Sequence, residues 1–246
     1  KVTLSSNTEF LNPFVLPEFQ NRYGTGLNGQ RSGSNIYSWG ERLNAASRYG
    51  YTPNDFFETG HVYTNAFTLS GGTDKNQTYF SAAAVNSDGI IPNNEYDRYN
   101  FTFRNTTYFL KDKLRLDASA SYIYQQDQNM TNQGVYSNPL VPAYLFPRGG
   151  DWNYYRDNYE IYDPNLNANV HNWVNTSLEQ FDNPYWILNR QKPISERNRY
   201  EFGGQVRYDI IEGLSVTGRM RYERADDNFK HNYYASSTAN RYPMGR

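Results

Sequence analysis

One short stretch, Leu114–Gln125, constrains the fold of this chain more than any other. Its even-numbered residues are leucine, alanine or tyrosine, and its odd-numbered residues are charged or polar apart from Ile123. Successive side chains of a β-strand point to opposite faces of a sheet. The stretch is therefore predicted to be a long strand with one apolar face and one polar face.

The segment before it, Tyr99–Phe109, alternates in the same way. Aromatic residues share one of its faces and polar residues the other: Tyr99, Phe101, Phe103 and Phe109 against Asn100, Thr102, Arg104 and Thr106. A tight polar turn, Lys111–Lys113, joins the two segments, so we expect a hairpin of long strands. Such strands suit either a half-buried sheet of a soluble protein or a barrel wall with lipid outside and water inside.

Alternation also predicts the remaining strands. They are expected at Lys1–Ser6, Asn65–Ser70, Thr78–Val85, Asn198–Asp209, Leu214–Arg224 and Asn232–Ala235. A short helix is expected over Glu41–Arg48, and a polar loop over Ala225–Lys230. The longest connection, residues 127–196, has no sustained period, and connections of that length are usually functional or disordered. Its many aromatic residues argue against disorder.

The connections alternate between tight turns and long loops along the chain. An up-and-down barrel of the outer membrane carries tight turns on one rim and long extracellular loops on the other. The sequence therefore favours an all-β, antiparallel, transmembrane barrel wall, with a soluble sheet that has one solvated face as the alternative. The charged residues expected to line a wet lumen are Arg104, Arg115, Asp117, Arg199, Glu201, Arg207, Arg219, Arg221 and Glu223.

Composition removes other classes of protein. Lysine and arginine number 24 against 25 acidic residues, so no nucleic-acid footprint is present. No window reaches the roughly 18 apolar residues of a membrane helix, but barrel strands alternate and average to a polar hydropathy. Because Lys1–Ser6 reads as a strand already under way and Tyr242–Arg246 closes no element, we expect residues 1–246 to be part of a larger β-barrel domain.

Motifs of catalysis and metal binding are missing from the sequence. Cysteine is absent, and the three histidines do not form the H-E-x-x-H zinc arrangement. There is no nucleophile elbow and no phosphate-binding loop. Asp163–Asn167 has the spacing of the start of a calcium loop, but Ala168 and Val174 stand where Gly and Glu belong, which favours an ordinary Asx turn. We predict no catalytic residue, metal or cofactor.

Aromatic residues of the 127–196 loop are the candidate binding residues. Exposed tryptophan and tyrosine rings stack on sugars or peptide side chains, and neighbouring Asn and Asp supply directional hydrogen bonds. The alternative is that the same rings pack the loop into a core of its own or cover the barrel rim. The candidates are Trp152, Tyr154, Tyr155, Trp173, Tyr185 and Trp186.

Five segments in the first part of the chain resemble one family. They are Leu16–Gly26, Phe67–Gly72, Tyr79–Ser81, Asp88–Ile91 and Tyr96–Phe101. In this order they resemble the early barrel of the SusC/RagA family of TonB-dependent outer-membrane importers. The rest of the chain is similar only in architecture.

The resemblance implies a 22-stranded barrel, an even number as in other bacterial barrels. It also implies a plug domain that contacts TonB, a surface lipoprotein of the SusD type as a lid, and import of glycans or peptides across the bacterial outer membrane. The plug, the TonB-contacting segment and the terminal strand are not recognisable in residues 1–246, so transport is implied for a parent protein. A soluble or surface-attached glycan-binding β-domain is the main alternative, and an all-β glycosidase a weaker one.

Overall fold

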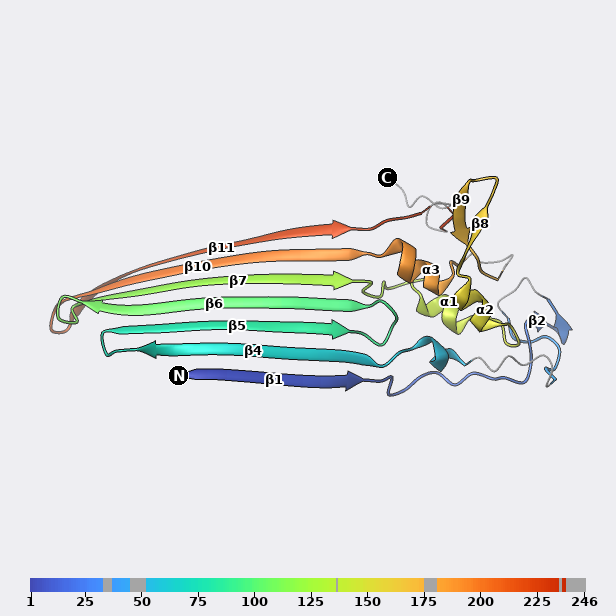
Figure 1. Cartoon of the computed structure of the whole chain (residues 1–246), viewed down its shortest axis with the longest axis horizontal. Helices are drawn as coiled ribbons and strands as arrows, with labels where there is room; N and C mark the ends of the chain where they lie inside the picture. Colours follow the sequence, from blue (N-terminus) through green and yellow to red (C-terminus); the bar gives the residue numbers. More distant parts are fainter. Residues whose placement is uncertain (33–36, 45–51, 136, 175–180, 235, 238–246) are drawn as a thin grey trace.

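The computed structural model describes residues 1–32, 37–44, 52–135, 137–174, 181–234 and 236–237. One antiparallel sheet of seven long strands dominates it, with short helices and hairpins gathered at one end (Figure 1). The long strands are β1 (Val2–Leu11), β4 (Gly60–Gly72), β5 (Asn76–Asp88), β6 (Glu95–Phe109), β7 (Leu114–Gln128), β10 (Ile194–Ile211) and β11 (Leu214–Lys230).

The sheet is an up-and-down meander. Its order is β1-β4-β5-β6-β7-β10-β11, so each long strand pairs with the next long strand of the chain. Within the described residues, the outer edges of β1 and β11 have no strand partner, and the sheet is open. Edge strands expose a row of unpaired backbone groups, which proteins usually cover or pair.

Every long strand predicted from alternation is present and longer than predicted, which confirms the antiparallel β architecture. Two predictions at the end of the chain are wrong. Ala225–Lys230 continues β11 instead of forming a loop, because its backbone stays paired with β10 and Asp227 meets Arg197 across the two strands at 2.6 Å. Of the strand predicted at Asn232–Ala235, residues 232–234 are not a strand, and residue 235 lies outside the described part of the chain.

The predicted helix at Glu41–Arg48 is only partly described. Residues 41–44 are not helical, and residues 45–48 lie outside the described part of the chain.

Tight turns and long connections lie at opposite ends of the sheet (Figure 1). The turns are 73–75, 110–113 and 212–213, and the long connections are 12–59, 89–94 and 129–193. The 110–113 turn holds Leu110, Lys111 and Asp112 in the left-handed region, with φ of 52°, 55° and 71°, which non-glycine residues rarely adopt. Because β7 and β10 are longer than predicted, the 127–196 loop is shortened to 129–193.

Strand register separates the side chains into two faces. Phe101, for example, lies opposite Ala82 and Tyr122, whereas Arg104 lies opposite Tyr79 and Ser119. The apolar face carries, among others, Leu4, Phe67, Leu69, Phe80, Phe101, Phe103, Leu116, Ala118, Ala120, Tyr122, Tyr200, Phe202, Val216 and Met220. The polar face carries all the charged residues that the sequence predicted to share a side.

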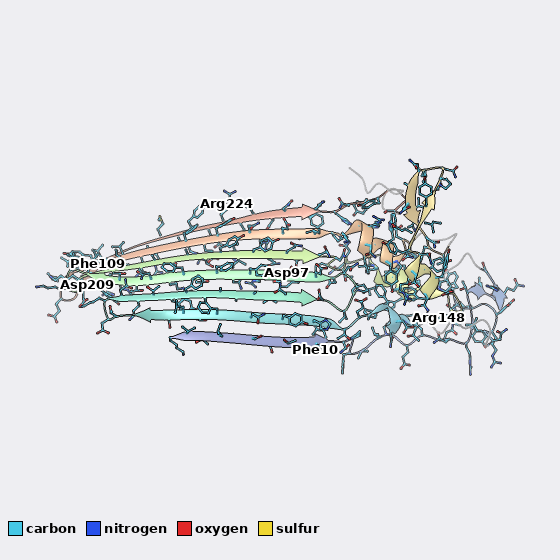
Figure 2. The ribbon with its side chains drawn as sticks, viewed as in Figure 1. Phe10, Asp97, Phe109, Arg148, Asp209 and Arg224 are labelled. Carbon is cyan, nitrogen blue, oxygen red and sulfur yellow. The ribbon has the colours of Figure 1, made fainter. Side chains whose placement is uncertain are left out.

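The apolar face is not a core. Phe101 is 43% exposed, Phe202 51% and Met220 74%. In Figure 2 no helix or second sheet of the described chain lies over the length of the long strands. A contiguous exposed apolar surface of this kind marks contact with a membrane or a protein partner.

The buried core lies at the loop end of the sheet. We call the described residues of 129–193, together with the short 3-10 helix η2 (Pro53–Phe56), the cap. Its other elements are α1 (Leu140–Tyr144), α2 (Trp152–Asp157), β8 (Glu160–Asp163), β9 (Ala168–His171), α3 (Pro184–Trp186) and the π-helical turn η3 (Ile187–Gln191). A further small hairpin, β2 (Gly26–Leu27) and β3 (Gln30–Arg31), lies in the 12–59 connection.

Candidate functional site

The polar face is laid out in rows that cross the strands. One row runs Arg104, Ser119, Gly203 and Arg221 over β6, β7, β10 and β11, because each residue is the register partner of the next. The neighbouring row on the same face runs Thr106, Asp117, Gln205 and Arg219. The alternation of each strand thus gives a continuous hydrophilic surface across the sheet.

An ion-pair network joins β10 and β11 on this face. Arg199 contacts Glu201 at 2.9 Å and Glu223 at 2.5 Å, and Arg221 contacts the same two carboxylates at 3.5 and 3.3 Å. Pairs this exposed contribute little to stability, typically about 0 to 1 kcal/mol. Their effect is to keep the surface charged and hydrated.

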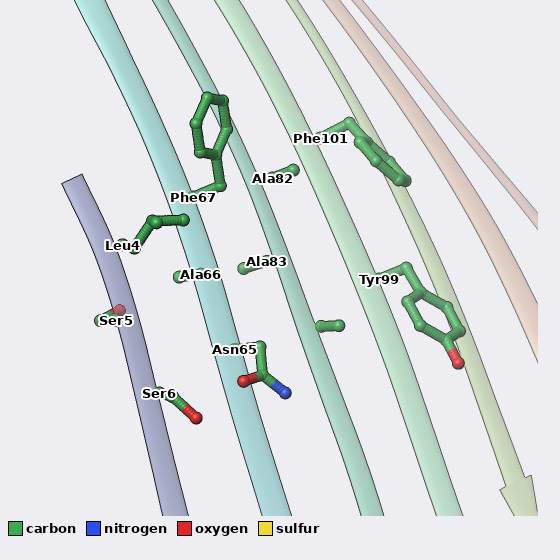
Figure 3. A pocket seen from close by; sticks show the side chains of 11 residues that line it. Leu4, Ser5, Ser6, Asn65, Ala66, Phe67, Ala82, Ala83, Tyr99 and Phe101 are labelled. Carbon is green, nitrogen blue, oxygen red and sulfur yellow. The ribbon is translucent and has the colours of Figure 1, made fainter. Parts of the chain in front are cut away.

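The apolar face has a shallow groove of about 450 Å³. Its lining includes Ala82 and Ala84 on β5. Phe67 on β4 and Phe101 on β6 lie on either side of Ala82 (Figure 3). The small alanines between large rings create the groove. The groove lies on the apolar face of the sheet, which no other part of the described chain covers.

The cap buries its aromatic residues against one another. Trp152 is 3% exposed and makes edge contacts with Phe146 and Phe56, with ring centroids 5.1 and 6.1 Å apart. Tyr185 and Trp173 pack on the same ring at 5.7 and 5.9 Å. This is the packing expected if the rings form a core of the loop itself.

The six candidate binding residues are therefore in different environments. Trp152 and Trp186 are buried, with 3% and 0% exposure, and both pack within the cap. Tyr155, Trp173 and Tyr185 are partly buried around the core. Tyr154 is 49% exposed, and its ring packs edge-on against Tyr155 at 5.1 Å. A binding role remains a prediction, for which Tyr154 is the best placed of the six.

Buried polar side chains, which the sequence did not single out, fix the shape of the cap. Asn183 donates from Nδ2 to the carbonyls of Tyr155 and Asn172, both at 2.8 Å. Trp186 Nε1 donates to Ser237 Oγ at 2.9 Å, which ties the cap to the chain after β11. The high asparagine content of the loop was the available signal, since amides satisfy buried backbone groups.

Further contacts join the cap to the sheet. Asn129 directly follows β7, and its Nδ2 donates to the carbonyls of Asn93 and Leu188, both at 2.9 Å. Within the cap, Arg190 pairs with Glu160 through two hydrogen bonds of 2.7 and 2.6 Å. These bonds hold the cap in a defined position over the end of β7.

Burial and charge shift the pKa values of groups in the cap. Burial raises the pKa of Tyr185 to about 12, since the phenolate would lose its hydration there. The hydrogen bonds and charge of Glu160 raise the pKa of Arg190 further above its ordinary value, so this guanidinium stays protonated.

The Asp163–Asn167 segment is the turn of the β8–β9 hairpin. Asp163 Oδ1 accepts a hydrogen bond from the backbone N–H of Asn165 at 2.8 Å, as in an Asx turn. Among the residues that the structure describes, no three metal-ligating side chains gather. No helix in the described ranges is long and apolar enough to cross a membrane.

Comparison with known proteins adds no assignment. No family model matches the chain, and the search of curated proteins likewise found no match. The similarity to SusC/RagA importers therefore rests on the sequence segments named above. The described chain consists of a two-faced sheet and a cap with a buried aromatic core at one end.

Proposed function

We propose that this sheet is a sector of a transmembrane β-barrel in the bacterial outer membrane. The barrel would belong to a TonB-dependent importer of the SusC/RagA type, with about 22 strands. In this proposal the apolar face contacts lipid, the polar face lines a wet passage, and the cap lies on the extracellular side. The solute is a glycan or a peptide, with a SusD-like lipoprotein as lid and TonB acting on the parent protein's plug.

The observation that carries the proposal is the exposed apolar face opposite a charged one. On β7 the apolar positions run from Leu114 to Tyr124, ten residue steps that cover about 33 Å at the usual rise. At a tilt of about 40°, that length gives an apolar band about 25 Å tall, the height found in outer-membrane barrels.

Tyrosine residues border this band on the side of the cap, as expected at a membrane interface. Tyr99 and Tyr124 stack there with ring centroids 6.2 Å apart, and their hydroxyl groups bond to Asn86 and Gln126 at 2.8 Å. Tyrosine is enriched at interfaces because its ring is apolar and its hydroxyl is polar. Beyond the tyrosines, the same face turns polar at Asp97.

The unpaired edges of β1 and β11 support continuation of the sheet. In lipid every backbone N–H and C=O must find a partner, so only closed barrels of strands span membranes. Further strands of the parent protein would pair with both edges. No catalytic residue is needed, since the passage acts by its shape and its hydration.

Expression with and without detergent tests the proposal. The expected result is that the parent protein aggregates in buffer alone and becomes monodisperse, with strand content by circular dichroism, in detergent or lipid vesicles. The glycan-binding alternative predicts a soluble monomer that binds sugar unaided, and a glycosidase would turn over a glycan. A soluble, detergent-free protein with native strand content would overturn the proposal.

A further inference from the structure

The polar face has a hollow of about 330 Å³ centred on β7 and β10. Its lining includes Arg104, Ser119, Gly203, Arg219 and Arg221. In the row from Arg104 to Arg221, the two inner positions are the small Ser119 and Gly203. Since neighbouring strands lie about 4.8 Å apart, the two arginine backbones are about 14 Å apart with an open floor between them.

Gly203 keeps that floor open. A Cβ at this position would come within 2.5 Å of Ser119 Oγ, so a larger side chain displaces the serine or fills the hollow. Glycine weakens a strand and often marks a close approach of a ligand or of another backbone. The lack of a side chain at Gly203 therefore has a steric effect on the polar face, because it leaves room above Ser119.

The charges around the hollow do not cancel. Asp117 is already engaged, because its Oδ1 accepts from Thr106 at 2.7 Å and pairs with Arg115 at 2.9 Å. Arg219 donates twice to the neutral amide oxygen of Gln205, at 2.9 and 2.7 Å.

Neither Arg104 nor Arg219 has a carboxylate partner within the described part of the chain. Arg221 is different, since it shares Glu201 and Glu223 with Arg199. Two uncompensated guanidinium groups therefore border an open cavity.

We propose that this hollow binds an oxyanion, a carboxylate or sulfate group carried by the solute that moves along the polar face. Arginine is the residue best suited to such groups, because its planar fork donates two parallel hydrogen bonds. Arg219 exchanges its neutral Gln205 partner for the anion, and Arg104 donates from the opposite side. The volume suits one sugar-sized unit. The proposal rests on the proposed function, in which the polar face borders the solute's path.

Isothermal titration of the full protein in detergent tests the site, with glucuronate, inorganic sulfate and neutral glucose as probes. Binding of glucuronate is expected and binding of glucose is not. We expect Arg104→Gln and Gly203→Leu each to weaken glucuronate binding at least tenfold. Arg98→Gln is the matched control, because Arg98 lies on the same strand and face and donates to the neutral Asn100 at 3.0 Å, but borders no part of the hollow.

The outcomes separate the two proposals. Binding of glucuronate that both hollow variants weaken supports the site, and equal binding of sulfate assigns it to the oxyanion alone rather than to the sugar ring. The site is overturned if wild type binds neither anion, or if Arg98→Gln weakens binding as much as Arg104→Gln. Circular dichroism confirms that each variant is folded. Because binding is measured in detergent, a failure to insert into vesicles would contradict the membrane proposal without touching the anion site.

Discussion

Replacing Phe101 by arginine places a charge inside the proposed lipid-facing band, between its Tyr99 border and its midplane. Phe101 lies close to the centre of β6 and stacks on Tyr122 with ring centroids 6.4 Å apart. An arginine facing lipid at the midplane of an outer-membrane barrel costs about 2 to 4 kcal/mol. Loss of the stacked aromatic pair adds about 0.5 to 1.5 kcal/mol. The cost of the charge decreases from the midplane towards the border, so at Phe101 we expect the free energy of unfolding to fall by about 2 to 4 kcal/mol in total.

Thr102→Arg is the matched control, since Thr102 is the next residue on the strand and lies on the polar face. There the new guanidinium meets water and the expected loss is below about 1 kcal/mol, as for most surface substitutions. Both variants are made in the parent protein, which is folded into phospholipid vesicles, unfolded with urea and followed by tryptophan fluorescence. If Phe101→Arg costs no more than Thr102→Arg, the apolar face does not contact lipid.

Two further predictions concern the cap. Burial raises the pKa of Tyr185 from 10 to about 12, so the buried neutral ring contributes to the stability of the cap below pH 10, and this contribution is lost as the pH rises towards 12. The melting temperature of the cap should therefore fall between pH 10 and pH 12. In Tyr185→Phe this fall should be smaller. An unchanged pH profile in the variant would show that Tyr185 is not the group responsible. Arg190→Gln should destabilise the cap by about 1 to 3 kcal/mol by leaving Glu160 without its paired hydrogen bonds. Arg156→Gln, which breaks only the exposed pair with Asp157, should cost under about 0.5 kcal/mol; equal protease sensitivity of these two variants would refute the structural role of Arg190.

Local alternation was sufficient to predict the sheet. A strand's face assignment depends on a period of two, which the sequence displays directly in Leu114–Gln125. The strand ends were less predictable, because β11 continues through the polar residues 225–230 by pairing with β10. Polar residues there looked like a loop, yet backbone pairing and the Arg197–Asp227 contact keep them extended.

The cap could not be predicted in the same way. Its core joins Phe56 of η2 to Trp152 and Leu188, residues far apart in the sequence and on elements too short to show a period. Sequence alone left the cap aromatics with two roles, and burial favours packing for Trp152. The hollow on the polar face had one sequence signal, the adjacent Gly203 and Gly204 within a strand. The net charge around the hollow depends on which carboxylate side chains lie next to it, and these are determined by the strand register.

Single cysteines on opposite faces of β7 test the membrane assignment most directly. Residues 1–246 contain no cysteine, so Ala120→Cys and Ser121→Cys each introduce one label site among them, on the apolar and the polar face respectively. Any cysteine elsewhere in the parent protein is first replaced by serine. A spin label is attached to each in the full protein folded into vesicles, and its collisions with lipid-soluble oxygen and with a water-soluble nickel chelate are compared. If β7 spans the membrane, collisions with oxygen dominate at residue 120, and collisions with the nickel chelate become relatively more frequent at residue 121. A label at residue 120 that the nickel chelate reaches as readily as at residue 121 would contradict the membrane assignment.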